Sequence, residues 1–411
     1  MKTNFVKLRW LFTMLLFVTT MIMPTMMLAK SIDLKIPEGD GAGTPYKIGT
    51  AEELYWFAGL VNGTLPGVKK DLSANAILTD DIIVNTGVLD PNKDLVSGND
   101  FIEWIPIGKS SSDDDAYTGT FDGNGHTISG LYFNKSNSWY VGLFGCIGAE
   151  GKISNVGVSD SYFQSSNCPY IGGVCGSNSG ELQNCSNSST VIGKENEYRI
   201  GGVCGYNERR YNEKGGIIEN SFNEGTVSGT GDYDVLNIGG VCGYNYGGTI
   251  KSCYNTASVS GQYSVGGVCG DNYEGPITNC YYLSGTVADG KGGIGGKDDE
   301  NGKAVEMSKD RFKSGEVAWL LNGSKSVSTE ESTLAWYQKL GENADAYPVL
   351  KSTDHNTVYK APLFSCDGTT RIGEYANKPE GDKLSHNYQM AEKADEGTSN
   401  LYSEECAICH N

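Results

Sequence analysis

Short apolar runs alternate with glycine-containing polar turns through the middle of the chain. The heptapeptide Gly-Gly-Val-Cys-Gly-x-Asn occurs at 172–178, 201–207, 239–245 and 266–272, and a degenerate copy begins at Val141. A repeat of a few tens of residues is typical of stacked coils, because one such unit cannot bury its apolar face alone. The pattern therefore predicts a solenoid.

Each unit contains apolar runs that are too short for helices, separated by turn signals. We expect three strands per unit: the Gly-Gly-Val-Cys-Gly run, a stretch such as 249–254, and a short Val-Ser or Thr-Val run. Polar insertions at 208–215 and 229–237 are expected to loop off the coil. The fold predicted is an all-β, right-handed parallel β-helix of about seven coils. Its inner column consists of Val174, Val203, Val241 and Val268.

Asparagines recur in register with the valines. The first column contains Asn178, Asn207, Asn245 and Asn272. Stacked amide side chains hydrogen-bond along such columns. A weaker column contains Asn155, Asn184, Asn220, Ser252 and Asn279. Asparagine also tolerates left-handed backbone in turns, so both columns are expected to be structural.

The repeats IGGVCGYNYGGTIKSCYNTASVSG and VGGVCGDNYEGPITNCYYLSGTV resemble the GLUG motif of bacterial surface and secreted proteins. The resemblance extends to the upstream segments 44–63, 103–108 and 119–134 and to the tail segments 307–323 and 335–350. GLUG motifs occur in adhesin-like proteins and in the non-catalytic part of an IgA-specific metallopeptidase. The resemblance implies a repeat architecture and a secreted or cell-surface location in a bacterium. It implies little about activity.

Composition divides the chain into five parts. Residues 1–29 are predicted to be a secretory signal peptide, because basic residues precede an apolar stretch that ends at Met27-Leu28-Ala29. The other parts are an N-terminal cap with the first coils (30–140), the GLUG-type repeats (141–300), a C-terminal cap (301–350) and a Cys/His-containing tail (351–411). Helical caps are expected at 51–62 and 308–322, because the end coils of a solenoid expose sheet edges.

The acidic balance limits the partners. The formal net charge is −18, which disfavours nucleic acid and anionic membranes. After the signal peptide, no stretch approaches the length of a membrane span. Export is therefore predicted, to a secreted or cell-surface location. The acidic loops 113–115 and 298–300 are solvated surface or calcium sites, since oxygen clusters suit that ion.

Tyrosines gather where the surfaces of the coils should lie. Tyrosine offers amphipathic contact area at low entropic cost, which suits a binding face. Packing against neighbouring coils is the competing interpretation. The candidate binding residues are Tyr206, Tyr211, Tyr244, Tyr246 and Tyr273.

Seven of the twelve cysteines lie in two repeat columns. Residues in register on adjacent coils are spaced more widely than disulfide geometry prefers, so we expect buried free thiols there. The columns contain Cys175, Cys204, Cys242 and Cys269, and Cys185, Cys253 and Cys280, with Ser221 replacing cysteine in the second.

The tail differs chemically from the repeats. Cys366, His386, Cys406 and Cys409 have a spacing compatible with tetrahedral zinc. Disulfide or unliganded cysteines are the alternative. Cys406-Ala407-Ile408-Cys409-His410 also matches a haem attachment pattern, but haem ranks last because almost no chain follows it to form a pocket.

Catalytic signals are sparse. None of the four histidines has an evident nucleophile partner, and no His-Glu-x-x-His sequence occurs. The Asp122–His126 turn is similar to turns in polysaccharide-cleaving β-helices, where paired carboxylates act as acid and base. The function predicted is a non-catalytic extracytoplasmic binding or adhesion protein for a glycan or a host surface protein. The alternatives are a polysaccharide lyase or hydrolase on the same scaffold and a structural stalk.

Overall fold

The structure is a computed structural model of the chain. The described residues are 32–110, 112, 114–194, 198–210, 214–230, 236–288, 291–295, 303–324, 334–341, 343–350, 355–365, 371–378, 381–384, 388–393 and 401–406. The side chain of Leu236 and those of 388–393 and 401–406 are not described. The predicted signal peptide, 1–29, lies outside these ranges.

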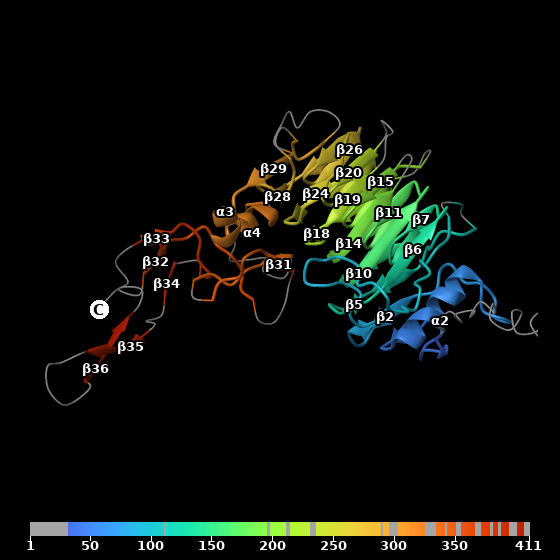
Figure 1. Cartoon of the computed structure of the whole chain (residues 1–411), viewed down its shortest axis with the longest axis horizontal. Coiled ribbons are helices and arrows are strands. Elements are labelled where there is room, and N and C mark those ends of the chain that lie inside the picture. Colours follow the sequence, from blue (N-terminus) through green and yellow to red (C-terminus); the bar gives the residue numbers. More distant parts are fainter. Residues whose placement is uncertain are drawn as a thin grey trace, which may run out of the picture. The chain divides into compact units, whose positions relative to one another are not determined.

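The fold is a right-handed parallel β-helix, as predicted (Figure 1). Successive coils contribute strands to four parallel stacks, which we number in the order in which one repeat passes through them. Sheet 1 contains β7 (Tyr140–Val141), β11 (Tyr170–Gly172), β15 (Tyr198–Gly201), β20 (Leu236–Gly239) and β25 (Ser264–Gly266). Sheet 2 contains β8 (Phe144–Ile147), β12 (Cys175–Asn178), β16 (Cys204–Glu208), β21 (Cys242–Tyr246) and β26 (Cys269–Tyr273).

Sheets 3 and 4 extend further toward the N-terminus. Sheet 3 contains β1 (Tyr46–Ile48), β2 (Ala76–Leu78), β4 (Thr120–Asp122), β9 (Lys152–Ser154), β13 (Glu181–Gln183), β17 (Ile217–Glu219), β22 (Thr249–Lys251) and β27 (Ile277–Thr278). Sheet 4 contains β3 (Ile82–Ile83), β5 (Thr127–Ser129), β6 (Tyr132–Ser136), β10 (Gly157–Ser166), β14 (Ser186–Lys194), β18 (Phe222–Asn223), β19 (Val227–Thr230), β23 (Tyr254–Asn255), β24 (Val259–Ser260), β28 (Cys280–Leu283) and β29 (Ala304–Met307).

The expectation of three strands per coil was wrong, because both of the longer runs bend. The Gly-Gly-Val-Cys-Gly run divides into a sheet 1 strand and a sheet 2 strand. The stretch 249–254 divides at Ser252, which has a left-handed φ of 53°. The corresponding corners, Asn155, Asn184, Asn220 and Asn279, have φ between 49° and 55°. The second asparagine column therefore marks the corner between sheets 3 and 4.

The first asparagine column is a buried ladder, as predicted. Asn178 Nδ2 donates to Asn207 Oδ1 at 2.9 Å, Asn207 Nδ2 to Asn245 Oδ1 at 2.8 Å, and Asn245 Nδ2 to Asn272 Oδ1 at 2.7 Å. Beside it, the backbone N–H groups of Val174, Val203 and Val241 each donate to the next valine along the inner column. These contacts join four coils along the helix axis.

A further buried ladder was not predicted. Asn187 Nδ2 donates to Asn223 Oδ1, and Asn223 Nδ2 to Asn255 Oδ1, both at 2.8 Å. This ladder explains the second glycine of the repeat motif. A Cβ atom on Gly202 would lie 2.2 Å from Asn223 Cγ and 2.2 Å from the carbonyl oxygen of Gly240. The motif needs glycine there because the amide ladder and the next coil fill the space.

The N-terminal cap is α2 (Ala51–Asn62), with the predicted bounds. Thr50 Oγ1 accepts from the N–H of Glu53, and Gly63 ends the helix in a left-handed conformation. The expected single helix at 308–322 is instead two, α3 (Lys309–Lys313) and α4 (Glu316–Leu321), separated by Ser314 and by Gly315 at φ 88°. Both helices contribute to a cluster with Tyr254, Tyr281 and Trp336.

The remaining strands form small sheets. An antiparallel pair joins β30 (Trp336–Tyr337) to β31 (Val349–Leu350). A three-stranded sheet contains β32 (Leu363–Phe364), β33 (Arg371–Gly373) and β34 (Asp382–Lys383), and another antiparallel pair joins β35 (Tyr388–Lys393) to β36 (Leu401–Cys406).

The nine cysteines whose side chains the structure describes are buried and free, which confirms the prediction for both columns. Cys175, Cys204, Cys242 and Cys269 pair in register along sheet 2. Burial raises the pKa of the Cys185 thiol to about 12. These thiols are apolar fillers of the core rather than nucleophiles, since the thiolate is the reactive form.

Candidate functional site

Six tyrosines form a continuous stack across five coils, which we call the tyrosine ladder. Its rings meet with centroid distances of 5.1 Å (Tyr140–Tyr170), 5.1 Å (Tyr170–Tyr206), 5.7 Å (Tyr206–Tyr244), 6.1 Å (Tyr244–Tyr246) and 5.2 Å (Tyr246–Tyr273). Every step except the tilted Tyr244–Tyr246 contact is stacked, with interplanar angles of 10–15°. The ladder members therefore cover one another's ring faces.

The ladder crosses from sheet 1 to sheet 2. Tyr140 and Tyr170 pair in register in sheet 1, where the next position is occupied by Arg199. Tyr206 and Tyr244 continue the stack in sheet 2. The Arg199 guanidinium lies 5.4 Å from the ring centroids of Tyr170, Tyr206 and Tyr244. Such cation–π contacts fix the arginine beside the stack.

The ladder is half-buried over most of its length and opens at one end. Tyr246 and Tyr273 are 38% and 49% exposed. Desolvation raises the pKa of Tyr170, Tyr206 and Tyr244, with nearby acidic groups such as Glu208 adding to the effect on Tyr206. The phenols therefore stay protonated at neutral pH and can donate hydrogen bonds.

Polar and charged groups border the exposed end. Asn237 Nδ2 donates to Asp271 Oδ2 at 3.4 Å, and Arg209 pairs with Glu274 at 3.3 Å. Arg209 and Glu274 adjoin the exposed tyrosines, because the Arg209 N–H donates to the Tyr246 carbonyl and Glu274 directly follows Tyr273. This arrangement fits a ligand that combines apolar contact with hydrogen bonding.

The structure brings together four of the five tyrosines predicted from the sequence, and Tyr211 lies outside the described residues. They also pack on neighbouring coils, so both interpretations of the tyrosines describe part of the arrangement. Sequence reasoning missed Tyr140, Tyr170 and Arg199. Each of the three directly precedes the first apolar residue of a repeat, in a strand of sheet 1. That shared position in the repeat could have shown that they stack.

The Asp122–His126 segment is a turn held by hydrogen bonds within it and to neighbouring segments. Asp122 Oδ1 accepts from the N–H of Asn124 and from Asn155 Nδ2, at 2.8 and 2.9 Å. Asn124 has a left-handed φ of 52°. His126 Nδ1 lies 3.3 Å from Asp81 Oδ1. The contacts of Asp122 and His126 position the turn.

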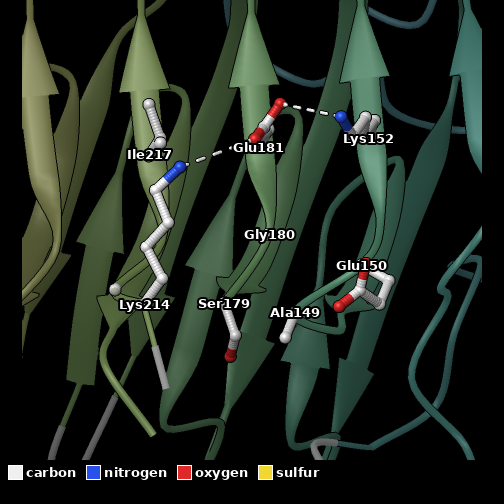
Figure 2. A pocket seen from close by; sticks show the side chains of 9 residues that line it. Ala149, Glu150, Lys152, Ser179, Gly180, Glu181, Lys214 and Ile217 are labelled. Atoms are coloured by element: carbon white, nitrogen blue, oxygen red, sulfur yellow. Dashed lines mark ion pairs between the residues drawn. The ribbon is translucent and has the colours of Figure 1, made fainter.

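A small pocket of about 290 Å³ lies on sheet 3 (Figure 2). Lys152 Nζ and Lys214 Nζ approach Glu181 from two sides, at 3.5 and 4.0 Å. Lys214 comes from the predicted insertion 208–215. These exposed pairs join adjacent coils and contribute little stability, because exposed ion pairs are screened by solvent.

A larger groove of about 630 Å³ follows the corner between sheets 3 and 4, and we call it the corner groove. One wall comes from the C-terminal cap. Its lining residues are Asn124, Gly125, Thr127, Asn155, Val156, Gly157, Gln183, Asn184, Ser186, Asn220, Phe222, Leu334, Ala335 and Leu350.

The described residues contain no group of three or more His, Cys, Asp or Glu side chains arranged to hold a metal. At the first predicted calcium loop, Asp115 pairs with Lys70 at 2.5 Å, and Asp113 is outside the described residues. The loop 298–300 is also outside them. Cys366, His386 and Cys409 and the side chain of Cys406 are not described either. Zinc stays a prediction: one zinc per full chain by elemental analysis, lost on Cys406→Ser.

The GLUG motif matches residues 234–260, which include the third repeat. The chain therefore carries the GLUG motif in this repeat. Halomucin of Haloquadratum walsbyi is 38% identical over 86 residues, or 21% of this chain and 1% of Halomucin. A protein of Evansella cellulosilytica, provisionally named a Gly-rich membrane protein, is 32% identical over 80 residues, or 19% of this chain and 9% of that protein. The chain thus spans a small part of the length of these relatives.

A solved structure shares the fold. It is provisionally named an immunoglobulin A1 protease and comes from Bacteroides ovatus. The TM-score is 0.50 at 19% identity, covering 77% of this chain and 95% of that one. The likeness is one of fold alone. Among the residues that the structure describes, no helix is long and apolar enough to cross a membrane.

Proposed function

We propose that the chain is an extracytoplasmic binding protein, without catalytic activity, that presents the tyrosine ladder to a glycan or a host surface protein. The observation that carries the proposal is the exposed end of the ladder, where Tyr246 and Tyr273 stack at 5.2 Å beside Arg209 and Glu274. Rings that are held in place by stacking lose little entropy on binding.

The surrounding observations support a binding role. The signal-like N-terminus and the membrane-protein name of one relative agree with a location outside the cytoplasm. The stacked faces of the inner rings are covered, so the ladder offers phenol O–H groups along its length and open ring surface at its exposed end. Such a strip suits hydroxyl-bearing or amide-bearing partners.

The test is a screen of the mature chain against glycan and host-protein arrays, alongside polysaccharide degradation assays. The variant Tyr246→Ala/Tyr273→Ala should weaken binding at least tenfold. Tyr132→Ala is the matched control, because Tyr132 is a half-buried, stacked tyrosine of sheet 4. Unchanged binding by the double variant would show that the tyrosine ladder does not contact the ligand. Released oligosaccharide would favour the alternative function, a polysaccharide lyase or hydrolase on the same scaffold.

A further inference from the structure

We propose that the corner groove is a second binding site, which takes an uncharged, hydroxyl-rich saccharide chain. The groove is separate from the tyrosine ladder: none of its lining residues belongs to the ladder. Either site can therefore fail without the other.

The groove exists because of a size change along one column of sheet 4. Thr127, Gly157 and Ser186 pair in register and are small. The next residue in that register is Phe222, followed by Tyr254. Phe222 and Tyr254 lie against Trp336 of the C-terminal cap, with ring centroids 5.9 and 5.2 Å away. The small residues leave open the space that the aromatic residues fill farther along.

The lining is polar but carries no ionisable side chain. Its polar groups are amides and hydroxyls, and its apolar groups come mainly from Val156, Phe222 and the cap. The pocket around Glu181, on the same strand as Gln183, is lined by two glutamates and two lysines. In a chain of net charge −18, an uncharged groove offers nothing to neutralise a charged ligand. Neutral polar ligands are favoured.

Two of the corner amides are held by hydrogen bonds along the corner, and a third residue of the wall, Gln183, is exposed. Asn184 Nδ2 donates to Asn155 Oδ1 at 2.9 Å, and Asn155 Nδ2 donates to Asp122 at 2.9 Å. Asn184 Oδ1 has no hydrogen-bond partner among the described residues, but the atom is buried and is not accessible from the groove. The amide of Gln183, an exposed residue of the groove wall, is a group that the hydroxyl groups of a ligand can reach.

An extended peptide fits the groove less well. Peptides that bind sheets add to an unpaired strand edge. The strands beneath the groove, β13 and β14, are paired on both sides, so they offer no free edge. Side-chain amides beside the Phe222 ring instead match the hydroxyl groups and apolar faces of a sugar chain.

The experiment is calorimetric titration of the full chain with short neutral oligosaccharides built from glucose, mannose, galactose or N-acetylglucosamine, with oligogalacturonate as the acidic counterpart. We expect a neutral oligosaccharide to bind. Ser186→Phe should weaken that binding at least tenfold by filling the groove. Gln183→Ala should weaken it by removing one amide while leaving the groove open.

The matched control is Ser188→Phe, which places the same side chain on the same strand at a position that does not line the groove. It should leave binding intact, as should Tyr246→Ala/Tyr273→Ala. Three outcomes would overturn the proposal: no neutral oligosaccharide binds, only the acidic one binds, or Ser186→Phe and Gln183→Ala both bind as the unmodified chain does. A failure of the tyrosine ladder to bind any ligand would contradict only the proposed function and not the site in the corner groove.

Discussion

Side chains at equivalent positions of successive coils determine the register in which the coils stack. Asn207 shows this most clearly: it is fully buried, its Nδ2 donates to Asn245 Oδ1 and to the Gly216 carbonyl, and its Oδ1 accepts from Asn178. A buried amide in water-free surroundings is tolerated only when such partners are present. The ladder therefore favours one register between coils over any slipped alternative.

Asn207→Ala should destabilise the β-helix by about 2–4 kcal/mol, since at least these three hydrogen bonds are lost at about 0.5–1.5 kcal/mol each and their partners are left buried. Urea unfolding would measure the difference. The control is Asn134→Ala, an exposed asparagine that accepts one bond from Gln164. Equal stability of Asn207→Ala and the unmodified chain would mean that the ladder does not join the coils.

The column thiols should be free but inaccessible. Denatured, unreduced protein is expected to react with a thiol reagent at the seven column cysteines at least. The native protein should react far more slowly there, because the nine described cysteines are buried and desolvation raises the pKa of thiols such as Cys146 to about 12. Blocked column thiols after denaturation would indicate bridges between coils.

At the scale of elements, the corner between sheets 1 and 2 depends on close approach. Gly202→Ala places a methyl group 2.2 Å from Asn223 Cγ and from the Gly240 carbonyl oxygen. Neighbouring backbone must move, which typically costs about 1–3 kcal/mol. Thermal melting should show a loss for Gly202→Ala but not for Gly43→Ala, whose Cβ would contact only Asp40 Oδ2 at 3.7 Å. Equal melting temperatures would contradict the account.

The repeat made the elements partly predictable. The regular spacing of residues such as Val174 and Asn178 predicted the stacking, because residues that stack on successive coils recur once per repeat. The bounds of α2 were predicted from its own amphipathic sequence. The corners were harder. The sequence contains the Gly-Gly pair and the corner asparagines, but the bend depends on contacts between coils, such as Gly202 against Asn223.

The candidate sites were predicted less fully for the same reason. The ladder changes column between Tyr170 and Tyr206, so alignment of repeats separates residues that stack at 5.1 Å. The corner groove combines small residues of sheet 4 with Leu334, Ala335 and Leu350, which follow the repeats in the chain. Only the folded arrangement brings these segments together.

For the whole molecule, buried thiols couple stability to alkaline pH. An unfolded thiol has a pKa of about 8.5, whereas burial raises the folded pKa of Cys146, Cys168 and Cys185 to about 12 and that of Cys204, Cys242 and Cys269 well above its usual value. Below about pH 8 both states hold the protons and stability is unaffected. As pH rises further the unfolded state releases protons first, so stability falls until the folded pKa is reached.

Raising the pH from 7.5 to 9.5, under reducing conditions, should therefore lower the free energy of unfolding by about 1.4 kcal/mol for each thiol whose pKa burial raises in this way. Buried tyrosines contribute mainly above about pH 10, so this window isolates the cysteines. Cys185→Ser should reduce the pH dependence of the free energy of unfolding by the contribution of one thiol. Little other effect is expected, because Ser221 occupies the equivalent position in the next coil. A stability independent of pH across the window would mean that the thiols ionise alike in both states.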